Sequence, residues 1–190
     1  MNLKSIASII LTMRNTIVLK IVLAAMFFAL GLVLPFLTGQ IPEIGSMLLP
    51  MHLPVFLCAL ICGWQYGSMI GLVLPIIRSL IFLMPPMFPT AVSMAFELCT
   101  YGLVTGIVYS LFKHKNIISV YVSLILGMIA GRIVWGIVQF SLLTITGNTF
   151  TFSAFITGAL LNAFPGIIVQ LILIPIIMLA VNKLKLLPSD

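Results

Sequence analysis

Long apolar runs alternate with short polar connections along the whole chain, and this pattern predicts membrane-spanning helices. A helix needs about 20 apolar residues to cross the roughly 30 Å hydrocarbon core of a bilayer. Runs of about that length occur at residues 18–38, 47–63, 65–84, 89–112, 117–142 and 153–182. We therefore expect an all-α integral membrane protein in which six transmembrane helices form one compact bundle, a single domain over residues 1–190.

The basic residues between these runs predict the orientation of the bundle. Lysine and arginine in short connections stay on the cytoplasmic side of a membrane. With six spans, the clusters at the two termini and between the fourth and fifth runs all fall on one side: Lys4, Arg14, Lys20, Lys113, Lys115, Lys183 and Lys185. The opposite connections, around Glu43, 85–89 and 144–151, contain no lysine or arginine. Both termini should therefore lie in the cytoplasm.

The first residues of the chain allow more than one interpretation. Residues 3–16 are amphipathic enough to lie along the inner membrane surface, and a plain extension of the first helix fits them equally well. Residues 1–36 have the basic start and apolar stretch of a signal peptide, but the apolar run is too long and no small-residue cleavage site follows it. We expect this segment to remain part of the protein.

Composition excludes several classes of function. The chain is 62% hydrophobic and 6% charged, with a formal net charge of +6. The basic residues lie at the ends of apolar runs, without interleaved aromatics, so we expect no nucleic-acid partner. Cys58 and Cys62 are one helical turn apart without a histidine or acid at ligand spacing, which favours packing over a metal site. We expect neither metal nor cofactor.

Known catalytic motifs are also missing from the sequence. It contains no GxxxxGK[ST] phosphate loop, no HExxH and no GxSxG, so neither ATP hydrolysis nor a familiar hydrolytic apparatus is encoded. Two similar halves, which many self-sufficient secondary transporters have, are not evident either. The chain is therefore predicted to be a small, non-enzymatic binding bundle that is a subunit of something larger.

Five polar residues from five predicted helices share one depth in the membrane. A rise of 1.5 Å per residue places Arg132, Arg78, Glu97, Asn162 and His52 in the outer half of the bundle. An arginine at the centre of a bilayer costs at least about 2.5–3.5 kcal/mol, so such residues usually face a partner or a functional site. This convergence predicts a binding site near the outer face.

Local spacing gives this predicted site two walls. Arg132, Trp135 and Gln139 are three and four residues apart, which places a cation, an indole and an amide on one helix face. Glu97 and Tyr101 begin a similar polar stripe on the preceding helix. Together these side chains could line a small-molecule site.

A purely structural alternative applies to the charged residues. Arg132 or Arg78 could pair with Glu97 inside the bundle and only fix its packing, since intramembrane charges usually pair. One carboxylate cannot neutralise two arginines, however. A bound anionic group would supply the missing partner.

Prolines concentrate at the predicted outer face. The segment MPPMFPT, residues 84–90, places Pro85, Pro86, Met87 and Phe88 between the third and fourth helices. Proline favours stiff, irregular backbone, and such backbone at membrane depth is tolerated where it is buried in protein or lines a cavity. We expect this segment to cover the site as a lid.

The order of these segments resembles a known family. Ala25-x-x-x-Ala29, then LLPMHLPVFLCALICGWQYG at 48–67 and LPIIRSLIFLMPPMFPTAVSMAFELCTYGLVTG at 74–106, are similar to the substrate-binding S components of energy-coupling factor (ECF) vitamin transporters. The likeness extends over about residues 18–182. It implies a multi-pass subunit of a prokaryotic plasma membrane that captures a vitamin from outside.

The resemblance also implies partners and a substrate class. An S component docks on a transmembrane coupling protein and two ATPases, and its small residues on the first helix, here Ala25 and Ala29, would contact the coupling protein. Two outer arginines against one glutamate suit a carboxylate or phosphate. Pantothenate is the favoured vitamin, because this branch of the family also resembles the pantothenate S components. Pyridoxine-type compounds, hydroxymethylpyrimidine and niacin remain alternatives.

Two other classes of function are open at this point. An autonomous carrier or channel could use the polar stripes to line a pore. An intramembrane enzyme could use His52 and Glu97 as acid and base, although no nucleophile or metal set accompanies them.

Overall fold

The computed structural model describes residues 3–38, 48–147, 151 and 155–183, and every regular element within these ranges is helical. In chain order the elements are α1 (Leu3–Val33), η1 (Leu34–Thr38), α3 (His52–Cys62), α4 (Trp64–Phe82), η2 (Met87–Ala91), α5 (Val92–Leu111), α6 (Ile117–Ile145), η3 (Thr157–Leu161) and α8 (Phe164–Lys183). The prediction of an all-helical bundle is confirmed.

Each of the six predicted spans contains residues of a described helix. Five stretches are long and apolar enough to cross a membrane, and α3 is a shorter apolar helix. The last predicted span is divided into η3 and α8, with the break just before Pro165. The predicted span limits at 47 and at 153, the connection around Glu43, and Lys185 lie outside the described residues.

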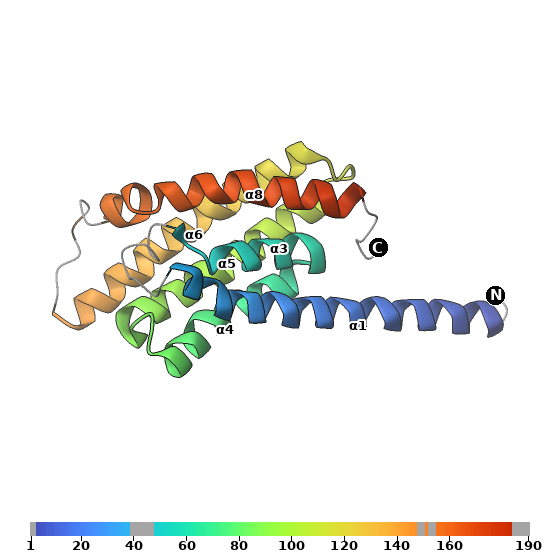
Figure 1. The fold of residues 1–190 in the computed structure, drawn as a ribbon, viewed down its shortest axis with the longest axis horizontal. Helices are drawn as coiled ribbons and strands as arrows, with labels where there is room; N and C mark the ends of the chain where they lie inside the picture. The colour runs from blue at the N-terminus through green and yellow to red at the C-terminus, as the bar shows by residue number, and fades with distance from the viewer. Residues whose placement is uncertain (1–2, 39–47, 148–150, 152–154, 184–190) are drawn as a thin grey trace.

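Successive helices run back and forth along the long axis of the bundle. The start of α1, the junction of α5 and α6, and the end of α8 all lie at one end (Figure 1). This end carries Lys113, Lys115 and Lys183 of the predicted basic clusters. Helix α1 continues without a break through residues 3–16 and projects beyond its neighbours (Figure 1). The opposite end holds η1, the start of α3 and η2, and it is the predicted outer end.

Glycines let α4 and α5 approach each other until their backbones touch. A Cβ added at Gly71 would lie 2.3 Å from the carbonyl oxygen of Leu98, and one added at Gly102 would lie 2.2 Å from the backbone of Gly67. Real Cβ atoms do not come this close to other heavy atoms. The α4–α5 pair is therefore held by main-chain contact, as small residues four apart allow.

Helix α6 packs on α5 through another pair of glycines. A Cβ on Gly127 would meet the hydroxyl of Thr105, and a Cβ on Gly131 would lie 2.2 Å from the ring of Tyr101. The GxxxG spacing on α6 thus opens room for two polar side chains of α5. One of them, Tyr101, belongs to the predicted site.

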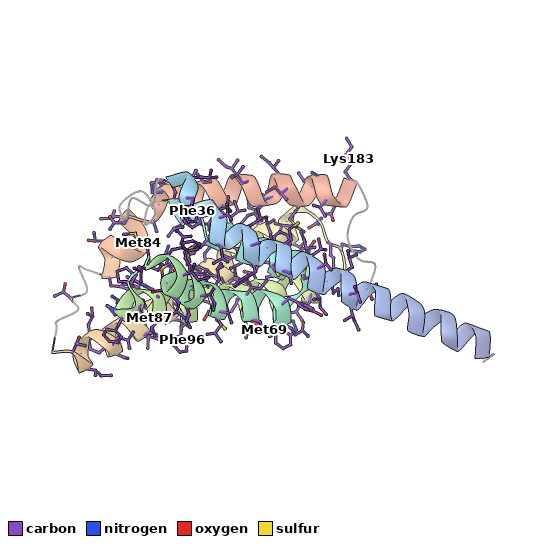
Figure 2. All side chains as sticks on the ribbon, turned by 60° about the horizontal axis from the view of Figure 1, so that its bottom comes forward. Phe36, Met69, Met84, Met87, Phe96 and Lys183 are labelled. Carbon is purple, nitrogen blue, oxygen red and sulfur yellow. The ribbon has the colours of Figure 1, made fainter. Side chains whose placement is uncertain are left out.

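Large apolar side chains cover the outside of the bundle. Met69 and Phe96 are 67% and 47% exposed, and both point away from the interior (Figure 2). A surface of this kind is expected where lipid tails rather than water surround the protein. Polar side chains are instead concentrated inside, among them His52, Arg78, Glu97, Thr105 and Gln170.

We expect Gly102→Ala to destabilise the bundle by about 1–3 kcal/mol, the usual cost of overpacking. The added methyl would meet backbone atoms of α4, which cannot move aside without separating the two helices. The midpoint of thermal unfolding in detergent measures the effect. Gly31→Ala is the matched control, because its methyl would meet only the end of the Leu74 side chain. Equal losses for both variants would contradict main-chain contact as the cause.

Candidate functional site

The carboxylate of Glu97 lies at the centre of the polar cluster. Glu97 is 1% exposed on α5, and its Oε1 lies 2.9 Å from Nη1 of Arg132 on α6. Tyr101, one turn further along α5, donates its hydroxyl hydrogen to the same oxygen over 2.7 Å. A buried carboxylate needs such partners, because burying it unpaired costs several kcal/mol.

His52 brings a third helix to this carboxylate. It is the first residue of α3, is 1% exposed, and places Nε2 3.7 Å from Oε1 of Glu97. The centroid of the His52 ring lies 5.4 Å from that of Tyr101. Phe56 stacks on Tyr101, with ring centroids 4.8 Å apart. Glu97 is therefore approached from α3, α5 and α6 at once.

The packing of α6 decides where these groups meet. The ring of Tyr101 fits against Gly131, one residue before Arg132, in space that any side chain would fill. This contact brings the Arg132 guanidinium over Glu97. The cation, the carboxylate and the phenol are thus positioned by one glycine and by the four-residue spacing of Glu97 and Tyr101.

Part of the Arg132 guanidinium has no hydrogen-bond partner among the described residues. Its side chain is 12% exposed, and Nε and Nη2 are buried without a hydrogen-bond partner among the described residues. These two nitrogens lie on one edge of the guanidinium, where their N–H groups are parallel. Such an edge matches the two oxygens of a carboxylate or phosphate.

The next turns of α6 carry an aromatic and an amide group. Trp135 is half-buried and stacks on Phe155 with ring centroids 6.2 Å apart, while a Cβ on Gly158 would meet the indole at 2.9 Å. Gln139 is half-buried, and its Oε1 has no hydrogen-bond partner in the described part of the chain. Both residues lie on the Arg132 side of α6, as their spacing predicts.

Two other predicted positions lie at the edge of the cluster. Asn162 follows η3, and its side chain is exposed rather than turned into the bundle. The predicted lid follows a left-handed residue at Leu83, contains cis peptide bonds before Pro85 and Pro89, and includes most of the short helical turn η2, which contacts α4, α5 and α6. Figure 2 shows Met84 and Met87 at this end of the molecule.

Arg78 has a different environment from Arg132. It is 2% exposed on α4, and its Nη1 donates to the carbonyl oxygen of Leu32 near the end of α1. The guanidinium also lies over the rings of Phe36 and Phe82, 5.1 and 5.2 Å from their centroids. The shared depth of the two arginines is therefore not a shared site: Arg78 joins α4 to α1.

Sequence reasoning missed the aromatic residues around the site. Phe56 and Phe155 hold Tyr101 and Trp135 in place, yet both resemble ordinary apolar residues of a membrane helix. The only signal for Phe56 is its position one turn after His52 on the same helix face. No comparable signal identifies Phe155.

Metal-ligating side chains do not gather in this cluster. No group of three or more His, Cys, Asp or Glu residues that could hold a metal ion occurs in the described ranges. Cys58 and Cys62 are buried in the apolar core on α3. The side chains that meet at the site offer charge pairing, hydrogen bonding and stacking.

The family model described as "ECF transporter, substrate-specific component" matches residues 19–178. Comparisons with curated proteins and with solved structures gave no match.

Breaking the Arg132–Glu97 pair from one side should destabilise the protein more than removing both partners. Arg132→Gln and Glu97→Gln should each cost about 3–5 kcal/mol, because each leaves a buried charge alone, and the double variant should recover most of that loss. Thermal unfolding of the four proteins in detergent gives the coupling free energy. Additive losses would show that the two groups do not stabilise each other.

Proposed function

Because the chain belongs to the family of ECF transporter substrate-specific components, we propose that it binds an anionic water-soluble vitamin, pantothenate first among them, at the cluster around Arg132. Members of this family are the substrate-binding membrane subunits of a transporter rather than enzymes, and they associate with a coupling protein and ATPases.

The free edge of Arg132 is the observation that carries the proposal. Nε and Nη2 are buried without partners among the described residues, while Nη1 is already paired with Glu97. A ligand carboxylate would accept two parallel hydrogen bonds from this edge without displacing Glu97. The guanidinium would then bridge the protein carboxylate and the ligand.

The neighbouring side chains suit a ligand that is polar at more than one point. Trp135 offers an aromatic face beside the cation, and Gln139 offers an unpartnered amide oxygen further along the same helix. A molecule with a carboxylate and a hydroxyl or amide donor could use both. Pantothenate has these groups, and this supports it over a ligand without an anionic end.

The position of η2 supports a lid. This turn contacts α6, the helix that carries Arg132, and Met87 and Phe88 are 37% and 48% exposed at its start. In our proposal, the segment of Pro85, Pro86, Met87 and Phe88 covers the ligand.

The outward face of α1 supports docking to the coupling protein. Ala25 and Ala29 are exposed, while Ala24 and Phe27 face the bundle. Two small residues four apart on a lipid-facing surface leave a shallow groove for another helix. Ile21 and Met26, 52% and 46% exposed, flank this groove. We propose that the coupling protein packs here.

Replacing Arg132 tests the ligand assignment. Arg132→Ala should weaken pantothenate binding by about 2–5 kcal/mol, the usual cost of truncating one partner of a buried charge pair. Arg132→Lys should restore only part of the loss, because an ammonium keeps the charge but lacks the planar edge. Isothermal titration calorimetry of the purified protein measures both.

Two controls separate a lost carboxylate contact from general damage. Ile133→Ala changes the lipid-facing neighbour of Arg132, which is 53% exposed, and should leave the affinity unchanged. The alcohol corresponding to pantothenate, which lacks the negative charge, should lose far less affinity in Arg132→Ala. Equal losses for the acid and the alcohol would rule out the carboxylate contact.

Bulky residues on α1 test the docking surface. Ala25→Trp and Ala29→Trp should leave pantothenate binding by the isolated protein intact while they abolish ATP-dependent uptake by the assembled transporter. Binding assays on the isolated protein, with uptake and co-purification of the coupling protein, distinguish the two effects. Lost binding with preserved assembly would reverse the assignment of this face. An autonomous carrier would take up its substrate without any co-purified ATPase.

A further inference from the structure

His52 is a buried titratable group whose position the proposed carboxylate contact does not explain. Its ring is 1% exposed, and neither Nδ1 nor Nε2 has a hydrogen-bond partner among the described residues. Its Nε2 lies 3.7 Å from Glu97 Oε1, close enough for charge attraction but too far for a hydrogen bond. Buried polar groups are usually satisfied, so these two ring nitrogens can each still take part in a hydrogen bond.

The charges around His52 balance before any ligand binds. Helix α5 presents Glu97 and Tyr101 to it, and α6 presents Arg132, so one carboxylate and one guanidinium cancel. On α8 the nearby polar residue is the uncharged Gln170, which donates to the carbonyl oxygen of Leu49.

The remaining elements packed on α3 are α1 and α4. The Arg78 guanidinium of α4 is directed to α1 and η1, and the basic residues of α1 lie toward its other end.

An anion bound to the free edge of Arg132 would upset this balance. One guanidinium would then face two negative groups, Glu97 and the ligand, and a buried excess charge is strongly unfavourable without a partner. Among the described residues, His52 is the neutral group beside Glu97 that can become positive. A protonated imidazole would donate from Nε2 to Glu97 Oε1 after a small movement of the ring.

We propose that His52 takes up one proton from solvent when an anionic ligand binds at Arg132, so that the site binds a monoanion together with a proton. This inference rests on the proposed function, since it takes the ligand to be an anion held by Arg132. It also assigns the selectivity of the site: a monoanion plus one proton restores neutrality, whereas an uncharged ligand needs no proton. His52 is thus a positioning residue that acts through Glu97.

The proton requirement predicts a direction for the pH dependence. If His52 is neutral in the free protein and protonated in the complex, pantothenate binds more tightly as the pH falls, by up to about tenfold per pH unit while one proton is taken up. The alcohol corresponding to pantothenate should bind with little pH dependence in the same range. The preference for the acid over the alcohol should therefore decrease as the pH rises.

A first experiment needs no ligand. Arg132→Gln removes the positive charge from the cluster and leaves Glu97 alone, which imitates the excess negative charge of the complex. The protein has two histidines, and His114 is exposed in the connection after α5, so a His114→Gln background leaves His52 as the only one. In nitrogen-15 histidine NMR spectra at about pH 6.5, the ordinary midpoint of histidine, His52 should be neutral with Arg132 present and protonated in Arg132→Gln. An unchanged protonation state of His52 would overturn the proposal. If Arg132→Gln does not fold, Arg132→Met serves as a second variant with the same change in charge.

A second experiment counts protons during binding. Titration of the whole protein with pantothenate in two buffers of different ionisation enthalpy should show uptake of about one proton above the midpoint of free His52. Glu97→Gln should bind with no uptake, because Arg132 and the ligand then cancel, and His52→Gln should also show none. His114→Gln is the matched control and should behave as the wild type.

The outcomes separate this inference from the proposed ligand. Pantothenate binding without proton uptake would overturn the inference while the carboxylate contact stands. Uptake that persists in His52→Gln would also overturn it, by assigning the proton to Glu97. If His52 becomes protonated in Arg132→Gln but pantothenate does not bind, the choice of vitamin is wrong and the proton-linked arrangement stands.

Discussion

The organisation of the outer half of this bundle depends on the Glu97 carboxylate. It lies inside a protein whose surroundings supply no water along the apolar surface, and it is accommodated because Arg132 and Tyr101 both contact Oε1. Those contacts require α5 and α6 to lie close together, and α3 begins beside them with His52 Nε2 3.7 Å from Glu97 Oε1. A single buried charge thereby holds α5 and α6 together, next to the first residue of α3.

Glycine supplies the close approach that this arrangement requires. Gly71 and Gly102 bring α4 and α5 into main-chain contact, and Gly131 makes room for the ring whose hydroxyl reaches Glu97. In lipid no hydrophobic force drives helices together, so close packing and interhelical polar contacts must hold them. The glycines therefore permit the short distance between the helices, and the polar cluster makes that distance favourable.

Depth in the membrane could be predicted from the sequence, but the direction of each side chain around its helix could not. Apolar length and the rise per residue placed Glu97, Arg132 and His52 at one level, and the structure brings them together. The same reasoning placed Arg78 and Asn162 there, yet Arg78 turns toward α1 and Asn162 is exposed. Direction depends on which helices are neighbours, and that is decided by contacts between segments far apart in the chain. For the same reason the supporting roles of Phe56 and Phe155 could not be recognised.

The two buried arginines show how environment separates equal charges into different roles. Arg78 donates to the carbonyl oxygen of Leu32 near the end of α1, where the helix dipole favours a cation. Pro35, three residues after Leu32, has no N–H that could bond to this carbonyl in a tightened turn. Two aromatic rings cover its guanidinium, so its contacts are made within the protein. Arg132 instead shares one nitrogen with a carboxylate and keeps an unpartnered edge among the described residues. Packing alone explains the first arginine, whereas the second retains donors that only another acceptor can satisfy. It is this difference, rather than the number of arginines, that supports an anion at Arg132.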